Sequence, residues 1–165
     1  MRTVILIFAI SLIALAGFSN EAKAQILDYN TMIGFRAGTC VGGSVKQFIA
    51  PQGAVELMVY NRWQGWVTAL LYEHHMDIRE FRGLEWYFGG GGHYGVWKEG
   101  KGIPPWTDQS NQDWTAYGVD LIVGLDYNIN NSNFYIAFDW KPAYNFQDFT
   151  GLWEDEAAFT LRYAF

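Results

Sequence analysis

Three adjacent residues, Glu73, His74 and His75, carry side chains that often bind a divalent metal ion. A zinc site built from imidazole and carboxylate ligands needs three or four such ligands at suitable spacing. Neighbouring residues on a β-strand point to opposite faces, so His74 and His75 cannot both reach one ion without a bulge. No second ligand pair follows at a suitable spacing. We therefore predict no metal site and interpret both histidines as interfacial or core residues.

A glycine pattern, Gly90-x-Gly92-x-x-Gly95, matches the letters of a dinucleotide-binding fingerprint. That fingerprint functions only between a strand and the N-terminus of a helix. Here it lies within a predicted strand and leads into a segment that contains Pro104-Pro105. We predict no cofactor, and we interpret Gly89–Gly92 as a bend or bulge where a sheet curves tightly.

A lipid hydrolase would need a nucleophile with a base nearby. Ser44 and His93 are predicted near the same end of two strands, and they form the pair to consider. The two strands are not neighbours in the predicted sheet. We therefore predict no catalytic residue and no enzymatic activity. The alternative is an enzyme that acts on lipids, either an acyl hydrolase or an acyl transferase.

The first 24 residues have the organisation of a secretory signal peptide. Arg2 provides the positive start, Val4–Gly17 is apolar apart from Ser11, and Ala22-Lys23-Ala24 is a small-x-small cleavage site. The apolar run is shorter than the roughly 20 residues that a membrane-spanning helix needs. We predict that residues 1–24 are removed and that residues 25–165 form one domain.

The composition indicates an exported β-protein. The chain has 17 acidic and 11 basic residues, and this acidic balance argues against nucleic acid as a partner. Cys40 is the single cysteine, so no internal disulfide can form. Aromatic residues make up 18% of the chain and 18 residues are glycine, which favours a β-fold with a membrane-facing surface.

Turn signals divide the mature chain into eight segments in which apolar residues fall on alternate positions. These segments are Thr31–Thr39, Ser44–Ala50, Ala54–Arg62, Trp66–His75, Leu84–Gly95, Thr115–Asn128, Asn133–Asn145 and Ala157–Phe165.

The connections alternate between short and long. Pro51-Gln52-Gly53 and Asn130-Asn131-Ser132 are tight turns, whereas Val96–Trp114 and Phe146–Glu156 are long. Outer-membrane barrels have short periplasmic turns and longer external loops, so we place the two long segments outside and expect any recognition surface there. Met76–Gly83 is long for a periplasmic turn, and an extension of the fourth strand accounts for part of its length.

The charged residues fall on one face of every predicted strand, and the other face is almost free of charge. A soluble lipocalin-like carrier would turn the charges to water, whereas a membrane barrel would turn them to the lumen. An eight-stranded barrel leaves an interior just wide enough for side chains, and the aromatic-rich face would overfill it. We therefore predict a membrane barrel with apolar side chains outside, and aromatic belts at the interfaces that include Trp63, Trp66, Trp86, Tyr127 and Trp140.

The inward charges then form a basic arc that faces an acidic arc. We expect them to pair across the lumen and to plug it, because unpaired buried charges are costly; a gated pore is the alternative. The predicted network consists of Arg36, Lys46, Glu56, Glu73, Glu85, Asp120, Asp139, Lys141 and Arg162.

The last strand resembles the C-terminal assembly signal of Gram-negative outer-membrane barrels, through Phe159, Leu161, Tyr163 and Phe165. The whole mature chain resembles the small OmpA/OmpX-type barrels, and more narrowly a group with no assigned activity. The segments that carry this resemblance are Gly53-Ala54-Val55-Glu56, Leu71-Tyr72-Glu73-His74-His75, Leu84-Glu85-Trp86-Tyr87-Phe88-Gly89-Gly90-Gly91, Asp139-Trp140-Lys141-Pro142-Ala143 and Leu161-Arg162-Tyr163-Ala164-Phe165.

The resemblance implies an all-β fold, an eight-stranded antiparallel up-and-down transmembrane β-barrel in the cell outer membrane. It also implies outer-membrane lipid and the barrel-assembly machinery as partners, and it carries over no catalytic residue. We therefore expect a non-enzymatic protein with a structural or surface-interaction role through its external loops, whose partner is unknown. The alternatives are the lipid-acting enzyme and the soluble carrier.

Overall fold

The computed structural model describes residues 31–100, 112–147 and 151–165. The predicted signal peptide and parts of the two long connections that were predicted to be external (101–111 and 148–150) lie outside the described residues. No helix among the described residues is long and apolar enough to cross a membrane. The strands are β1 (Thr31–Gly38), β2 (Val41–Ala50), β3 (Gly53–Arg62), β4 (Gly65–Asp77), β5 (Leu84–Trp97), β6 (Trp114–Asn128), β7 (Phe134–Trp140), β8 (Ala143–Asn145), β9 (Leu152–Trp153) and β10 (Ala157–Ala164).

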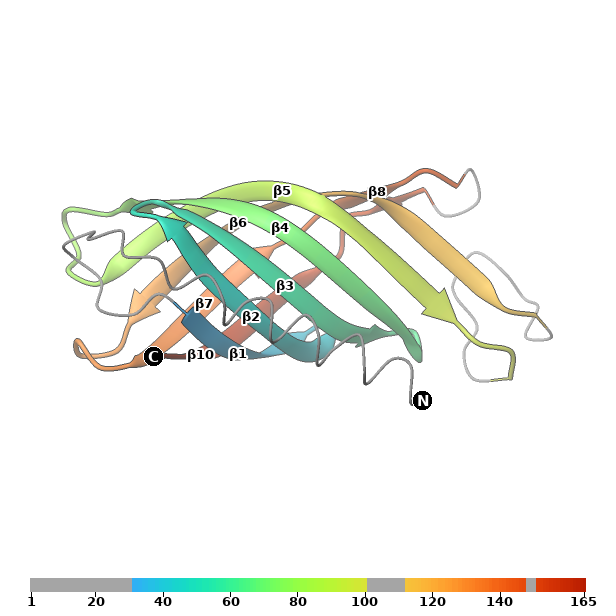
Figure 1. The fold of residues 1–165 in the computed structure, drawn as a ribbon, viewed down its shortest axis with the longest axis horizontal. Helices are drawn as coiled ribbons and strands as arrows, with labels where there is room; N and C mark the ends of the chain where they lie inside the picture. The colour runs from blue at the N-terminus through green and yellow to red at the C-terminus, as the bar shows by residue number, and fades with distance from the viewer. Residues whose placement is uncertain (1–30, 101–111, 148–150) are drawn as a thin grey trace.

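The strands close into one antiparallel barrel (Figure 1). Each of β1 to β6 pairs with the next strand, β10 pairs with both β7 and β1, and no edge is left between the first and last strands. β7 and β8 both pair with β6 and together form one barrel strand, and β9 and β10 together form the last one. The predicted eight-stranded antiparallel barrel is confirmed.

The two ends of the barrel differ. We call the end where β1 begins and β10 finishes the terminal end, and the opposite end the loop end. The turns at the terminal end are Pro51-Gln52, residues 78–83 and residues 129–133, whereas the loop end carries both long connections. In Figure 1, β5 and β6 reach farthest toward the loop end.

Several strand limits differ from the predicted ones. β2 begins at Val41 instead of Ser44, β5 continues to Trp97, and β4 continues to Asp77, so part of the long turn after β4 is strand. The predicted seventh strand is interrupted at Pro142, whose nitrogen cannot donate to a neighbouring strand. Its carbonyl still accepts a hydrogen bond from the Leu121 backbone N–H at 2.9 Å.

A β-bulge lies in the last barrel strand, within a segment predicted to be a loop. Trp153 pairs with Ala143, and Ala157 pairs with Trp140. Three residues of the last strand, 154–156, therefore lie opposite only two residues of the neighbouring strand, 141 and 142. An extra residue shifts the alternation of side chains by one position, and as a result Trp153 and Glu156 both point inward, where each is at most 3% exposed.

The glycines of β5 allow a close approach of β4. The pairing of β4 with β5 runs through Gly89–Gly92 without a register shift, so this segment contains no bulge. A Cβ atom on Gly89 would lie 2.0 Å from the Tyr72 carbonyl oxygen, and one on Gly91 would lie 1.9 Å from the Leu70 carbonyl oxygen. Glycine is needed there because any side chain would push the two backbones apart.

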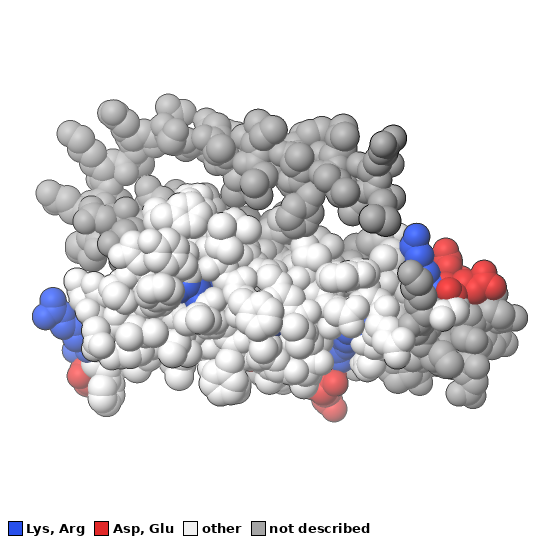
Figure 2. All heavy atoms as spheres, turned by 90° about the horizontal axis from the view of Figure 1, so that it is seen from below, with Lys and Arg blue, Asp and Glu red and all other residues white. Residues whose placement is uncertain are grey.

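Side chains alternate between an apolar outside and a charged inside. Outward residues on β6, such as Tyr117, Leu121 and Tyr127, are 42–67% exposed. In the described part of the chain, every exposed Lys, Arg, Asp or Glu lies at one of the two barrel ends. Those at the terminal end are Asp77, Arg79, Glu80 and Arg82, and those at the loop end are Lys98, Glu99, Asp113, Glu154 and Asp155. Figure 2 shows one face, on which most of the described surface is uncharged and the charged residues lie at the two extremes of the long axis and in a few small patches between them.

Candidate functional site in the barrel interior

Eleven charged side chains point into the barrel because they occupy inward positions of strands or of the bulge. Each of these residues is at most 4% exposed: Arg36, Lys46, Glu56, Arg62, Glu73, Asp120, Asp126, Asp139, Lys141, Glu156 and Arg162. Glu85 lies at the terminal end, where its side chain is 20% exposed. An interior with this many charges is stable only if the charges pair with one another.

The first group of ion pairs, which we call the terminal-end cluster, is centred on Lys46 and Arg162. The Lys46 Nζ atom lies 2.6 Å from a Glu73 oxygen and 3.4 Å from a Glu56 oxygen. Arg162 donates to both Glu56 oxygens, at 3.1 and 3.2 Å, and to Asp126 at 2.9 Å. Lys46 also lies 3.9 Å from an Asp126 oxygen, so each cation bridges at least two carboxylates.

His75 extends this cluster toward the terminal end. Its ring nitrogens lie 3.1 Å from a Glu85 oxygen and 3.4 Å from a Glu73 oxygen. The ring stacks on Tyr87 with centroids 5.0 Å apart and contacts Phe48 at 4.9 Å. His75 therefore has the character of a core histidine.

A single bidentate pair lies next to this cluster. Arg36 donates a hydrogen bond from one terminal nitrogen to one Asp139 oxygen at 2.6 Å, and its other terminal nitrogen lies 2.6 Å from the second oxygen. The Tyr87 hydroxyl donates a further hydrogen bond to Asp139 at 3.2 Å. Charge-assisted hydrogen bonds of this kind are about twice as strong as hydrogen bonds between neutral groups.

A second group, the loop-end cluster, is centred on Lys141 and Glu156. Lys141 Nζ lies 2.8 Å from Asp120 and 3.0 Å from Glu156. Glu156 also accepts hydrogen bonds from Arg62 at 2.8 Å and from the Tyr60 hydroxyl at 3.2 Å. The ring of His93 lies 3.0 Å from an oxygen of Asp120.

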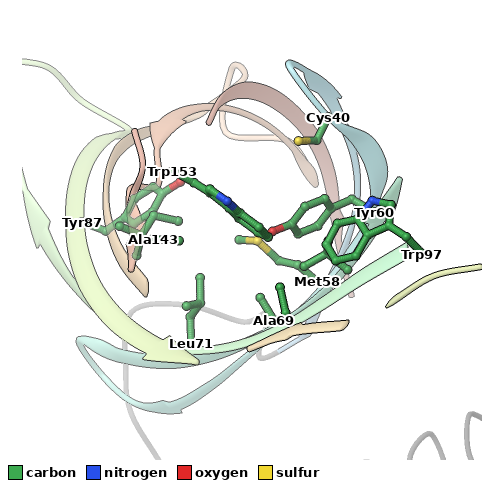
Figure 3. Packing of buried hydrophobic residues seen from close by; sticks show 12 residues of the cluster. Cys40, Met58, Tyr60, Ala69, Leu71, Tyr87, Trp97, Ala143 and Trp153 are labelled. Carbon is green, nitrogen blue, oxygen red and sulfur yellow. The ribbon is translucent and has the colours of Figure 1, made fainter. Parts of the chain in front are cut away.

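Aromatic and aliphatic side chains fill the space around the ion pairs. Figure 3 shows Met58, Tyr60 and Leu71 pointing into the barrel, with Trp97 and Trp153 in the same buried cluster. A smaller buried group closes the terminal end and consists of Met32, Tyr135, Ala164 and the partly buried Phe48. The interior is a packed core of mixed polarity.

The structure brings all nine residues of the predicted network inside the barrel, although Glu85 is only partly buried. The predicted arrangement of two facing arcs is too simple. Some pairs cross the lumen, as Arg162 and Glu56 do, whereas Lys46 and Glu56 are direct neighbours in the ladder of β2 and β3. Four further residues on the inward face were not assigned to the network: Arg62, His75, His93 and Asp126. Glu156 was also missed, because the bulge changes the direction in which its side chain points.

The other predicted site residues lie apart. Among the described residues, no group of three His, Cys, Asp or Glu side chains could hold a metal ion. His75 points inward, whereas His74 points outward and contacts Phe88 with ring centroids 5.8 Å apart. Ser44 on β2 and His93 on β5 are separated by β3 and β4, and His93 is engaged with Asp120 and Asn145.

The outward faces carry the remaining predicted features. The residues of the proposed assembly signal, Phe159, Leu161, Tyr163 and Phe165, are 45–62% exposed on the outside. Trp66, Trp86, Tyr127 and Trp140 are also exposed on the outside, as a belt requires. Trp63 differs from them, because its ring packs against the buried cluster at the loop end.

Cys40 lies in the turn between β1 and β2, where it is 2% exposed. Its sulfur lies 4.0 Å from a terminal nitrogen of Arg62. Burial raises the pKa of the Cys40 thiol above its ordinary value. Because the thiolate is the reactive form, this environment makes the thiol slow to react.

The sequence matches no protein-family model and no curated protein. The structure is similar to the crystal structure of the N-terminal β-barrel domain of Pseudomonas aeruginosa OprF, with a TM-score of 0.63. The alignment covers 83% of this chain and 98% of the OprF domain, at 19% sequence identity. At this level of identity the likeness shows the fold, and it agrees with the closed eight-stranded barrel described above.

Proposed function

We propose that this chain is an integral β-barrel protein of the outer membrane, with a non-enzymatic structural or surface-interaction role and a lumen plugged by its ion pairs. The observation that carries the proposal is the placement of charge. Among the described residues, the outward positions between the two barrel ends hold no Lys, Arg, Asp or Glu. An aqueous environment would not require this exclusion, whereas lipid does, because outward Lys or Arg at the bilayer midplane costs about 2–4 kcal/mol.

The height of the apolar surface supports the same proposal. On β6 the outward residues from Tyr117 to Tyr127 are apolar or aromatic over ten residue steps. At about 3.3 Å per step and a strand tilt of about 40°, this segment spans about 25 Å along the barrel axis. Outer-membrane barrels have an apolar band of about 25 Å.

Aromatic side chains at both edges of this band fit the two membrane interfaces. Tyr127 and Trp86 lie near the terminal end, and Tyr117 and Trp66 lie near the loop end; all four are 38–57% exposed. Tyr and Trp are enriched at such interfaces because their rings are apolar and their polar atoms reach water. A soluble carrier barrel would need the reverse arrangement, with an apolar interior and a charged outside.

The packed interior supports a structural role without ion flow. Lys46, Arg36 and Lys141 each contact at least one buried carboxylate within 3.0 Å. Opening a continuous aqueous path would require several such contacts to break together, and each is costly to break. Ser44 and His93 lie on strands separated by β3 and β4, and His93 is engaged with Asp120 and Asn145, so the enzymatic alternative gains no support.

Partners of the protein follow from its location. Outer-membrane lipid would surround the apolar band, and the barrel-assembly machinery would recognise the last strand. Any further partner would meet the external loops Val96–Trp114 and Phe146–Glu156, which are described only in part.

Two experiments test this proposal. Full-length protein expressed in a Gram-negative host should fractionate with the outer membrane, should need detergent for extraction, and should migrate differently on gels before and after heating. Purified protein in planar bilayers should show no steady openings. Recovery in the soluble periplasmic fraction would contradict the membrane assignment, and long-lived large conductance would contradict the plugged lumen.

A further inference from the structure

The turn between β3 and β4 has an unusual composition for its backbone shape. Trp63 and Gln64 have φ values of 49° and 63°, in the left-handed region. Tight hairpin turns of this kind favour Asn and Gly, because larger side chains crowd the backbone. The equivalent pair at the terminal end, Asn130 and Asn131, follows the usual preference with φ values of 51° and 57°. A tryptophan in this position needs a compensating contact.

The compensating contacts of Trp63 lie over the mouth of the barrel. The Arg62 guanidinium lies 4.1 Å from the Trp63 ring centre and 4.8 Å from that of Trp153. The Trp63 and Trp153 rings meet edge to face with centroids 5.4 Å apart. Trp97 donates a hydrogen bond from its indole nitrogen to the Arg62 carbonyl oxygen at 2.9 Å, which fixes the backbone below.

The Arg62 guanidinium also forms ion pairs with two residues of the bulge in the last barrel strand. Arg62 binds Glu156, which is buried, and Asp155, which is 63% exposed on its side chain. Cation–π contacts and a charge-assisted hydrogen bond thus meet at one side chain. Arg62 joins the β3–β4 turn to the opposite wall of the barrel.

We propose that Arg62, Trp63, Trp153, Asp155 and Glu156 form a latch over the loop end of the barrel. In the closed latch, Arg62 contacts the rings of Trp63 and Trp153 and binds Asp155 and Glu156 of the bulge. The latch opens independently of the terminal-end cluster. This inference rests on the proposed membrane function. When the latch opens, water enters the loop-end part of the lumen, while the ion pairs of Lys46 and Arg162 keep the barrel closed to ions.

The terminal-end cluster and the latch differ in the backbone structure that supports them. In the terminal-end cluster Lys46, Glu56 and Arg162 occupy positions where the strands are paired in register, and their side chains are fully buried. The register shift of β2 comes only at the end of that strand, between Phe48 and Ala50. The latch instead combines a bulge, where the backbone ladder is broken, with a turn in an unfavourable conformation. Asp155 is open to solvent, so water competes for its pairing with Arg62.

Cys40 gives a natural reporter of the latch. It is the chain's single cysteine, lies at the loop end next to Arg62, and is 2% exposed. In the closed latch a membrane-impermeant maleimide should reach this thiol slowly, because labelling requires the latch to open first. The labelling rate therefore measures the population of the open form.

The test compares two equal changes from carboxylate to amide in the full-length protein reconstituted in lipid vesicles. Glu156→Gln weakens the latch, and Asp126→Asn, a matched control, weakens the terminal-end cluster. Hydrogen bonds between charged groups contribute more than those between a charged and a neutral group, so Glu156→Gln should raise the Cys40 labelling rate about tenfold. Asp126→Asn should change that rate by less than about twofold, and neither variant should conduct ions.

An unchanged labelling rate in Glu156→Gln would overturn the latch, and so would an equal rise in both variants, because the interior would then open as one unit. Folding of each variant is checked by gel mobility before heating. If Glu156→Gln does not fold, Asp155→Asn at the exposed side of the latch takes its place, with an expected rise of about twofold to threefold and the same contradictory outcomes. Failure of the proposed function would appear separately, as a parent protein that leaves the membrane fraction or conducts.

Discussion

Replacement of Arg36 by methionine should destabilise the barrel strongly. The two side chains of the Arg36–Asp139 pair are at most 1% exposed, and both contacts measure 2.6 Å. Arg36→Met leaves the Asp139 carboxylate inside the barrel with the Tyr87 hydroxyl as its only partner among the described residues. Loss of one member of a buried ion pair costs about 3–5 kcal/mol, so the free energy of unfolding should fall by that amount.

The double variant Arg36→Met with Asp139→Leu separates the cost of an unpaired charge from the value of the pair. Removing both charges leaves apolar side chains of similar length, and such exchanges are often neutral. The Tyr87 hydroxyl then loses its acceptor, at a cost of about 1–3 kcal/mol. We therefore expect the double variant to be more stable than Arg36→Met by about 2 kcal/mol, within the usual range of coupling energies between residues in contact.

Urea unfolding in lipid vesicles, followed by tryptophan fluorescence and by the folded band on unheated gels, measures these differences. Arg79→Met is the control, because Arg79 is exposed in the turn after β4, and such a change should alter stability by less than about 0.5 kcal/mol. If Arg36→Met lies within about 1 kcal/mol of the parent protein, below the cost of an unpaired buried charge, the carboxylate of Asp139 is hydrated and the lumen is not dry.

Three further substitutions test the barrel itself. Leu121→Lys, on an outward residue that is 67% exposed, should cost about 2–4 kcal/mol in vesicle unfolding, and a neutral result would argue against lipid at this position. Gly91→Ala should prevent recovery of the folded gel band, because the new Cβ would lie 1.9 Å from the Leu70 carbonyl oxygen; normal folding would show that β4 and β5 can separate there. Pro142→Ala should change unfolding by less than about 1 kcal/mol, because the Leu121 hydrogen bond uses the carbonyl of residue 142; a larger loss would show that the ring of Pro142 matters.

The alternation of residue types was enough to predict the barrel and the side to which each strand residue points. On β6, for example, Leu121 and Asp120 could be assigned to opposite faces because the side-chain period in a strand is two. The apolar outside and the charged inside follow from this parity, since a shift by one residue would reverse every assignment. These features are local in the sequence and need no knowledge of the neighbouring strands.

The partners of the charges could not be predicted in the same way. Pairing depends on the stagger between strands, and Arg162 reaches Glu56 only because the closed barrel sets the relative heights of β10 and β3. The inward position of Glu156 could not be predicted for a different reason. The bulge changes the parity between Trp153 and Ala157, and nothing in the letters of residues 154–156 distinguishes a bulge from a loop.

The orientation of the aromatic side chains at the strand ends could be predicted only in part. Trp63, Trp66 and Trp86 were expected in the interfacial belts. Trp66 and Trp86 do lie outside, whereas Trp63 packs against the buried cluster at the loop end. Trp97 and Trp153, which were not assigned to a belt, enter the lumen near the loop end, where the glycine at position 65 leaves room for the Trp97 ring. Whether a ring at a strand end turns inward depends on such gaps in neighbouring strands, which only the assembled barrel reveals.

Spin labels on adjacent residues of β6 test the central assignment of inside and outside most directly. Cysteines at Leu121 and Ile122, introduced singly with Cys40 replaced by serine, carry the label on the outward and inward faces, where the native side chains are 67% and 2% exposed. In lipid vesicles the label at 121 should collide readily with oxygen dissolved in the acyl chains, and the label at 122 should be shielded from oxygen and from a polar nickel reagent. Higher oxygen accessibility at 122 than at 121, or strong nickel accessibility at 121, would contradict a barrel whose apolar face meets lipid.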